Sequence, residues 1–309
     1  MTKPRRHLPD QTVMLTRRTV ARQFLLRPDK SMNHIIEFET AKASERHGLE
    51  VHAAVGMSNH VHFVATDTTG DRSCFMRDAM SGIARARNNY IGRRGYVWGA
   101  GQYSDVLLPD ENSLQRKLLY TWLNPVRAGL VERVEDWPGF MILPKHWGKT
   151  ITVKCPDSFY GRNSPDEVTF TPKPPPGYED WELEKAREHF EELIRKEEDR
   201  IHNEHPDRRY KGAQRVKADD LYDSPEGKPD DGRLDPTFAT KDPELRELLL
   251  KRHRTFQDDY QTMRQRWLKG QQVTFPSGTV QLPEQAPVEA HEVDDDEPGR
   301  LGILRKDTG

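Results

Sequence analysis

The chain has 309 residues, of which 32% are charged and 34% hydrophobic, and its mean hydropathy is −0.91. A composition this polar predicts that part of the chain lies outside a packed core. Its two cysteines are too few for a disulfide framework or a cysteine-built zinc site. The basic N-terminus leads into no apolar segment, and no run approaches the ~20 apolar residues of a membrane span. We therefore expect a soluble cytoplasmic protein that has no membrane partner.

The net charge of −2 conceals an uneven distribution. Residues 1–150 contain 22 Lys and Arg against 15 Asp and Glu, whereas residues 151–309 contain 26 against 35. A basic first half and an acidic second half indicate a domain that faces nucleic acid, followed by a different region. Ordinary surface charge would explain the same numbers, so charge alone does not decide between the two.

The pattern of apolar residues in the first half of the chain predicts an α+β fold. Apolar and polar residues roughly alternate over 11–27, which indicates a strand or hairpin. Apolar residues at helical spacing predict a helix over 31–47, with Ser31 as its N-cap and Gly48 as its stop. This order, continued by the elements below, predicts a ferredoxin-like antiparallel sheet with helices on one face. The further expected elements are strands at 50–56 and 60–66 around a turn at 57–59, a helix at 73–91, and a helix at 111–124 that Pro125 ends or bends.

Beyond residue 150 we expect a mainly helical, partly disordered C-terminal extension. Helices are expected at 179–204 and 243–269, and the apolar stripe of the second either folds back on the first domain or dimerises. Many Pro, Gly and Asp residues between 205 and 240 indicate disorder or a long loop. The expected segments are a first domain over 1–150, a Pro-rich linker over 151–178, a helical extension over 179–282 with a flexible middle, and an acidic disordered tail over 283–309.

Two histidines form the first candidate site. His60 and His62 are two residues apart in a predicted strand, so their side chains point to the same face of the sheet. Two imidazoles on one face can bridge one divalent ion, and imidazole suits Mn, Zn, Fe and Ni better than Mg. The pattern alone has another common interpretation, a pair of surface or hydrogen-bonded histidines.

Tyr120 and Asn124 form the second candidate site. They are four residues apart in a predicted helix and therefore lie on one of its faces. A tyrosine can act as a covalent nucleophile, but a phenol with a pKa near ~10 needs help, such as a metal ion that neutralises and orients a phosphate. The other interpretation is a half-buried aromatic side chain with a hydrogen-bonded hydroxyl group.

The two sites lie in blocks of sequence whose order and spacing are typical of one family. The first block is Met57 to Val64, MSNHVHFV, and the second is Tyr120 to Val131, YTWLNPVRAGLV. The segment Asp136 to Pro138, DWP, also fits the family. Over residues 10–145 the chain resembles the REP-associated tyrosine transposases, within the insertion-sequence 200/605-like group of HUH single-tyrosine transposases.

The resemblance implies a role for each candidate residue. His60 and His62 would be the metal-binding pair, Asn124 a third metal ligand and Tyr120 the nucleophile, in a catalytic domain over 1–150. Tyr120 would attack the scissile phosphate, form a 5′-phosphotyrosine link and free a 3′-hydroxyl, and the reverse step would join strands. The implied cofactor is a divalent metal, Mg or Mn. The implied partner is single-stranded DNA with hairpin structure, bound by a monomer or a homodimer.

Six arginines are candidate contacts to DNA phosphates, which provide affinity but little sequence information. Tyr90, Tyr96 and Trp98 could stack on unpaired bases. The alternative for each arginine is a solvated helix face. The candidates are Arg77, Arg85, Arg87, Arg93, Arg94 and Arg127.

Two other functions remain open. One is a domesticated relative that binds structured single-stranded nucleic acid without cutting it. The other is an unrelated metalloprotein with a chance His-x-His pair. The presence of both histidines and the tyrosine favours the enzyme over the binder, and the block from Tyr120 to Val131 argues against a chance pair.

Overall fold

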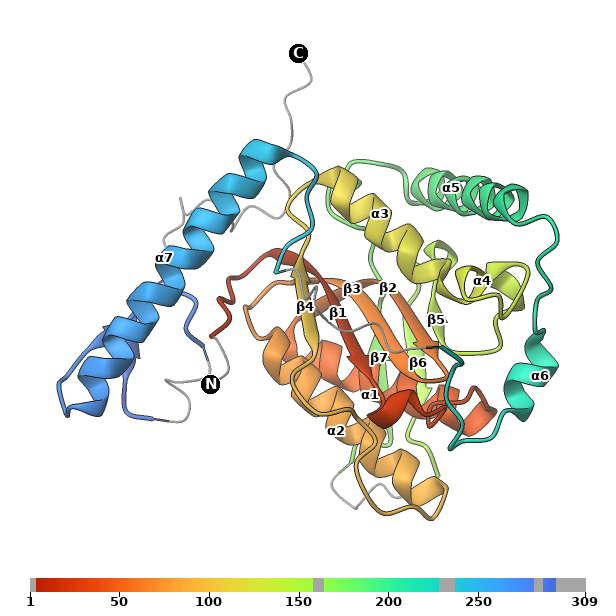
Figure 1. Ribbon diagram of the computed structural model, residues 1–309, viewed down its shortest axis with the longest axis horizontal. Helices are drawn as coiled ribbons and strands as arrows, with labels where there is room; N and C mark the ends of the chain where they lie inside the picture. Colours follow the sequence, from red (N-terminus) through yellow and green to blue (C-terminus); the bar gives the residue numbers. More distant parts are fainter. Residues whose placement is uncertain (1–3, 158–163, 228–236, 281–285, 293–309) are drawn as a thin grey trace.

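The computed structural model describes residues 4–157, 164–227, 237–280 and 286–292. Its centre is a five-stranded antiparallel sheet with the strand order β4-β1-β3-β2-β5 (Figure 1). In chain order the elements are β1 (Gln11–Arg18), η1 (Val20–Arg22), α1 (Lys30–His47), β2 (Leu49–Met57), β3 (His60–Asp67), α2 (Arg72–Tyr90), β4 (Ser104–Leu107), α3 (Glu111–Trp122), α4 (Asn124–Arg127), η2 (Val134–Asp136), β5 (Met141–Ile142), η3 (Pro144–His146), β6 (Ile151–Lys154), β7 (Glu167–Phe170), α5 (Leu183–Glu204), α6 (Ala213–Ala218), α7 (Pro243–Leu268), β8 (Thr274–Phe275) and β9 (Glu289–Ala290).

The strand order is that of a ferredoxin-like fold. The elements β1, α1, β2, β3, α2 and β4 follow one another, and the four strands lie side by side as β4-β1-β3-β2. The expected hairpin is present, since Met57 pairs with His60 across a two-residue turn. β5 adds a fifth strand beside β2. The predicted α+β class with an antiparallel sheet is confirmed.

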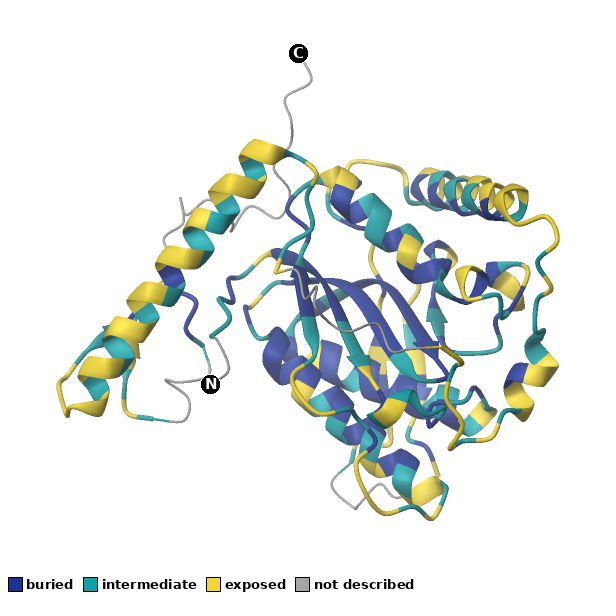
Figure 2. Cartoon of the chain, viewed as in Figure 1, coloured by how far each residue is buried: buried dark blue, intermediate teal, exposed yellow. Residues whose placement is uncertain are grey.

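The first face of the sheet packs against α1 and α2, whose inward sides are buried (Figure 2). Val61, Phe63 and Ala65 alternate along β3, point to this face and are fully buried. The ring of Phe63 meets that of Phe75 on α2 edge to face, with centroids 5.5 Å apart. Burying each such phenyl ring contributes roughly 1.5–3 kcal/mol, so this core anchors β3 at the centre of the sheet.

The second face is also covered by helices, which corrects the expectation of helices on one face alone. Val55 and Val64 point to this face and are buried in a cluster with residues of α3 and α5. Trp122 of α3, Trp147 and Phe190 of α5 pack together, with ring centroids 5.3–6.1 Å apart. A sheet whose central strands are apolar on both faces needs a covering layer on each.

The ends of α1 show which capping residues determine its length. The carboxylate of Asp29 accepts a hydrogen bond from the backbone N–H of Met32 at 2.8 Å, so the helix begins at Lys30 and Ser31 lies inside it. The expected N-cap is therefore two residues too late. Gly48 ends the helix in the left-handed conformation with φ 63°, as its sequence position predicts.

The described residues of 151–178, a segment expected as a linker, are packed onto the fold. β6 and β7 form a hairpin whose Val153, Val168 and Phe170 are buried in the core on the α1 side. Tyr178 is buried against Phe190, with ring centroids 4.9 Å apart. The apolar residues of this segment therefore reach the core. The division of the chain into domains stays a prediction.

The described part of the segment 205–240 is an ordered loop with the short helix α6. Val216 on this helix is fully buried, so of the two expectations for this segment, disorder or a long loop, the loop is the one observed in its described part. Residues 228–236, and the whole expected acidic tail apart from 286–292, lie outside the described residues. Within the described ranges, no helix has the length and apolar character needed to cross a bilayer.

α7 lies away from the sheet and is mostly exposed (Figures 1 and 2). The N-terminal segment joins it to the rest of the fold. Arg6 places its guanidinium 5.8 Å from the ring centroid of Phe256 and donates to the hydroxyl of Ser277 at 2.9 Å, while the N–H of His7 donates to the carbonyl of Gly278 at 3.0 Å. Gly278 has φ 82°, and a Cβ there would lie 3.0 Å from the His7 carbonyl oxygen. The N-terminal segment thus links α7 to the fold, and whether its apolar stripe folds back further or dimerises stays a prediction.

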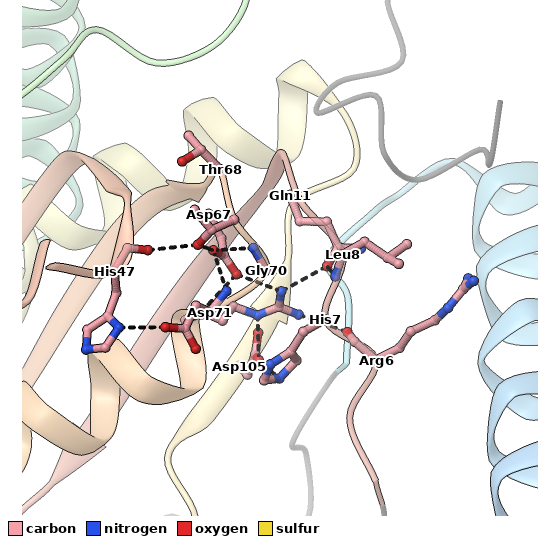
Figure 3. Close-up of polar contacts among 12 residues, drawn as sticks. Arg6, His7, Leu8, Gln11, His47, Asp67, Thr68, Gly70, Asp71 and Asp105 are labelled. Carbon is pink, nitrogen blue, oxygen red and sulfur yellow. Dashed lines mark hydrogen bonds and ion pairs between the residues drawn. The ribbon is translucent and has the colours of Figure 1, made fainter. Parts of the chain in front are cut away.

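A buried arginine ties the N-terminal segment to three strands. Arg72 donates from Nε to Asp105 at 2.9 Å, and from Nη1 to Gln11 at 3.0 Å and Asp67 at 3.3 Å. Its Nη2 donates to the carbonyl of Arg6 at 3.1 Å. Figure 3 shows the side chains of Asp67, Asp105 and Gln11 converging on this one guanidinium group. Burial would raise the pKa of Asp105, but the charge of Arg72 outweighs it and holds that pKa below its usual value.

Replacing Arg72 by Met should lower the free energy of unfolding by about 3–5 kcal/mol, because Asp67 and Asp105 would keep buried charges without their partner. Urea denaturation measures this loss. The matched control is Arg46→Met, since the side chain of Arg46 is 71% exposed and pairs with Asp78 at 3.5 Å. That variant should lose at most ~1 kcal/mol. Equal small losses in both variants would contradict the role of the buried arginine.

Candidate active site

The sheet face beneath α3 carries the two histidines. β1 pairs with β3 so that Thr16 lies opposite His62 and Arg18 lies opposite His60. Residues directly opposite each other on antiparallel strands point to the same face, so these four side chains form one patch. The patch lies at the end of β3 that adjoins the β2–β3 turn.

Each histidine has one ring nitrogen held by a neighbour. Nδ1 of His62 lies 2.6 Å from Oγ1 of Thr16, and Nδ1 of His60 lies 2.6 Å from Oδ1 of Asn59. When Nδ1–H donates in each case, Nε2 carries the lone pair of the neutral ring. The two rings stand edge to face with centroids 4.6 Å apart. The arrangement therefore offers two imidazole acceptors close together.

α3 and α4 bring Tyr120 and Asn124 to this patch. α3 ends at Trp122 and α4 begins at Asn124, so Pro125 interrupts the helix as predicted. The ring centroid of Tyr120 nevertheless lies 5.6 Å from that of His62, and Nδ2 of Asn124 lies 3.3 Å from Nε2 of His62. Tyr120 is 37% exposed, which leaves it open to a ligand from solvent. All four residues meet within one chain.

Burial and positive charge keep both histidines neutral. Burial, followed by the charge of Arg18, lowers the pKa of His60 to about 4. Burial, then His60 and the cations of Arg18 and Lys117, lower the pKa of His62 well below 6.5. The ammonium of Lys117 also lies 5.2 Å from the ring centroid of Tyr120. Neutral imidazoles surrounded by cations suit an anionic ligand such as a phosphate group.

The donor atoms of the patch fit a divalent metal ion. Metal binding requires neutral imidazoles, and the hydrogen bonds that Thr16 and Asn59 make to Nδ1 are of the kind that orient metal-binding histidines. Among the described residues, no group of three or more His, Cys, Asp or Glu side chains could hold a metal. The third protein donor would thus be an amide, and a flip of the Asn124 side chain puts Oδ1 where Nδ2 now lies.

Arg87 is not available to DNA, which corrects its expected role as a phosphate contact. Its side chain is fully buried, Nε donates to the carbonyl of Leu25 at 2.5 Å, and Nη1 lies 3.5 Å from Asp29. The sequence contains a signal of this burial, because Arg87 follows Met80 and Ile83 at helical spacing on the apolar side of α2. A buried guanidinium with a carbonyl and a carboxylate partner has a structural role.

The other five candidate arginines do not line the histidine patch. Arg127 on α4 pairs with Glu197 on α5 at 2.5 Å and so helps to hold the extension in place. The remaining four come from α2, which covers the opposite face of the sheet, or from the loop after it: Arg77, Arg85, Arg93 and Arg94. Their contact with DNA stays a prediction.

The sequence patterns did not single out four residues that surround the patch. These are Thr16, Arg18, Asn59 and Lys117. Lys117 precedes the tyrosine by three residues, and this helical spacing could have identified it. The two residues of β1 could not be found in this way, because no pattern in the sequence gives the register of β1 against β3.

No protein-family model matches the chain, and no curated protein matches it. A solved structure of a REP-associated tyrosine transposase bound to a REP hairpin is similar to it, with 21% sequence identity and a TM-score of 0.40. The similarity covers 47% of this chain and 85% of that chain.

Replacing Arg18 by Gln should raise the pKa of His60 above its value of about 4, because a cation that disfavours protonation is removed. Titration of the imidazole signals by NMR measures this shift. Arg17→Gln is the matched control, since Arg17 is the neighbouring residue of β1 and points to the other face. It should leave the pKa of His60 unchanged. An equal shift in both variants would mean that the effect is not local.

Proposed function

We propose that this chain is a transposase-like endonuclease that cleaves and rejoins single-stranded DNA at hairpin-associated sites. The observation that supports this most directly is the convergence of Tyr120 and Asn124 on His60 and His62. A partly exposed tyrosine beside two neutral imidazoles and two cations offers a nucleophile and the groups that balance charge on a phosphate. The motif blocks around these residues support hairpin-bearing DNA as the partner.

In the proposed reaction, the hydroxyl oxygen of Tyr120 bonds to the phosphorus as the bond from phosphorus to the 3′ oxygen breaks. The tyrosine proton passes to solvent, and the departing 3′ oxygen takes a proton from solvent. The products are a 5′-phosphotyrosine link and a 3′-hydroxyl. One phosphodiester replaces another, so the reverse step can join strands without a nucleotide cofactor.

Two cations beside the tyrosine would act on the phosphate. Arg18 and Lys117 are the groups whose charges reach the histidines, and Lys117 also contacts the tyrosine ring. Held there, they would balance the negative charge that grows on the phosphate oxygens during transfer. They would also favour binding of the DNA backbone at this end of the sheet over binding elsewhere on that face.

His60, His62 and Asn124 would hold a divalent ion, Mg or Mn, with Thr16 and Asn59 orienting the two imidazoles. When bound, the ion would supply Lewis-acid polarisation of the scissile phosphate. Two imidazoles favour Mn over Mg. Since nucleophile and histidines belong to the same chain, the site needs no second subunit, and both a monomer and a homodimer are compatible with it.

Replacing Tyr120 by Phe should abolish a covalent protein–DNA adduct, because the ring remains but the attacking oxygen is lost. The assay incubates the protein with hairpin-bearing single-stranded DNA and Mn, and a denaturing gel detects the adduct. Tyr96→Phe is the matched control, since Tyr96 is 86% exposed and lies in the loop after α2. That variant should form the adduct as the native chain does.

No adduct with the native chain, or an equal adduct with Tyr120→Phe, would defeat the catalytic proposal. Retained affinity for the same DNA without an adduct would favour the alternative of a domesticated, non-cleaving binder. Both outcomes can be measured on one sample of protein. Fluorescence anisotropy of labelled DNA first measures the binding affinity, and the denaturing gel then measures the covalent adduct.

Replacing Thr16 by Val should weaken Mn binding about 10- to 100-fold, because the hydrogen bond that orients His62 is lost at nearly constant volume. Calorimetric titration with Mn measures the change. Thr12→Val is the control, since Thr12 lies on the same strand and face but bonds Thr66 at 2.9 Å instead. Similar affinity in both variants would contradict the assigned metal site.

A further inference from the structure

A basic groove separates α7 from the ferredoxin-like fold. It has a volume of about 650 Å³ and lies between α7, the start of α2 and the loop that leads to β4. A second hollow of about 390 Å³ adjoins it and shares Arg5 in its lining. We call the larger hollow the α7 groove, and the residues used below are Arg5, Arg17, Arg77, Arg264, Trp98 and Tyr260.

The lining of the groove has an excess of positive charge, of which the charge of Arg77 is balanced by Asp78 at 2.9 Å. This lining includes four arginines and, within the described ranges, no aspartate or glutamate. Among the described residues, Arg17 donates to the carbonyl groups of Gly99 and Gly101, and burial and the neighbouring Arg5 lower its pKa. Nη1 of Arg5 is buried without a hydrogen-bond partner among the described residues. Arg5 and Arg17 therefore repel each other, and Arg5 retains an unused donor, an arrangement that calls for an anionic ligand.

Aromatic side chains line the same groove. Trp98 lies in the loop before β4 and is fixed by a hydrogen bond from its indole N–H to the carbonyl of Met80 at 2.7 Å. Tyr260 enters from α7 and packs against Phe275, with ring centroids 5.3 Å apart. Arginines that bind phosphates, combined with aromatic rings on which bases stack, are typical of sites for unpaired nucleic acid.

The groove and the histidine patch lie on opposite faces of the sheet and approach each other at the end of β1. The loop that leads to β4 also pairs with β1, because the N–H of Gly99 donates to the carbonyl of Arg18 at 2.9 Å. Arg18 points to the patch and Arg17 to the groove. Gly99 and His60 flank this end of β1 on opposite sides, which puts them two strand spacings apart, on the order of 10 Å. A DNA strand that turns around this end of β1 would therefore reach both faces.

We propose that the α7 groove binds an unpaired DNA segment that continues from the strand held at the histidine patch. This inference rests on the proposed function and adds to it a role for the C-terminal extension. The arginines hold the backbone of the segment, while Trp98 and Tyr260 stack on its bases. The extension thereby lengthens the binding site beyond the hairpin and its cleavage point.

Arg264→Gln tests the groove without touching the patch. The probes are a labelled hairpin and the same hairpin with a single-stranded extension of about ten nucleotides, within the ~4–16 that such sites cover. The variant should bind the extended hairpin at least about threefold more weakly, with a shallower salt dependence, and bind the plain hairpin as the native chain does. Arg266→Gln is the matched control, two residues further along α7, exposed and outside the lining.

Photocrosslinking provides an independent readout. An extension that carries 5-iodouracil should crosslink to the peptide containing Trp98 or Tyr260 in the full-length chain. Crosslinks confined to other peptides, or equal affinity of Arg264→Gln and the native chain for the extended hairpin, would overturn the proposal. An equal loss for the plain hairpin would also overturn it, since the groove would then bind the duplex.

The outcomes separate this inference from the proposed function. A covalent adduct at Tyr120, together with unchanged DNA affinity of the Arg264→Gln variant, would support the cleavage reaction and contradict DNA binding in the groove. If the Arg264→Gln variant binds the extended hairpin more weakly but the native chain forms no adduct, the groove would still be a nucleic-acid site and the proposed cleavage reaction would be contradicted.

Discussion

The pairing of β1 with β3 is the constraint on which the candidate site depends. A slip of one residue would turn Thr16 and Arg18 away from the histidines, because alternate residues of a strand face opposite sides. What prevents the slip is packing on the other face, where Phe63 and its apolar neighbours fill the core under α1 and α2. The hydrophobic core on one face of the sheet thus positions the side chains of the candidate site on the other face.

The second covering layer positions the tyrosine. In a bare ferredoxin-like fold, the face opposite the two helices is open, and here α3 crosses it with Tyr120 near its end. Trp122, two residues later, is fixed by its indole hydrogen bond to Ile142 at 2.8 Å and by the rings of Trp147 and Phe190. Because Phe190 belongs to α5, the C-terminal extension holds the helix that carries the proposed nucleophile.

The parts of this structure that depend on local sequence could be predicted, and those that depend on distant pairing could not. The alternation of side chains along a strand predicts that His60 and His62 share one face. The ease with which glycine adopts a left-handed conformation predicts the end of α1 at Gly48. The covering of the second face escaped prediction, because it depends on the aromatic residues of α5 meeting α3 from far along the chain. Thr16 and Arg87 illustrate the same limit, since each acquires its role from a partner that only the folded chain brings close.

The hydrogen bond from the N–H of His7 to the carbonyl of Gly278 bears on the order in which the parts of the chain fold. During synthesis the first residues emerge long before the segment that receives them, and domains tend to fold from the N-terminus as they appear. The sheet, with its histidines and tyrosine, can therefore assemble before Ser277 and Gly278, which bond Arg6 and His7, have been synthesised. The basic groove depends on α7 and therefore forms late, so a nascent or shortened chain would carry the candidate site before the groove that is proposed to bind a longer DNA segment.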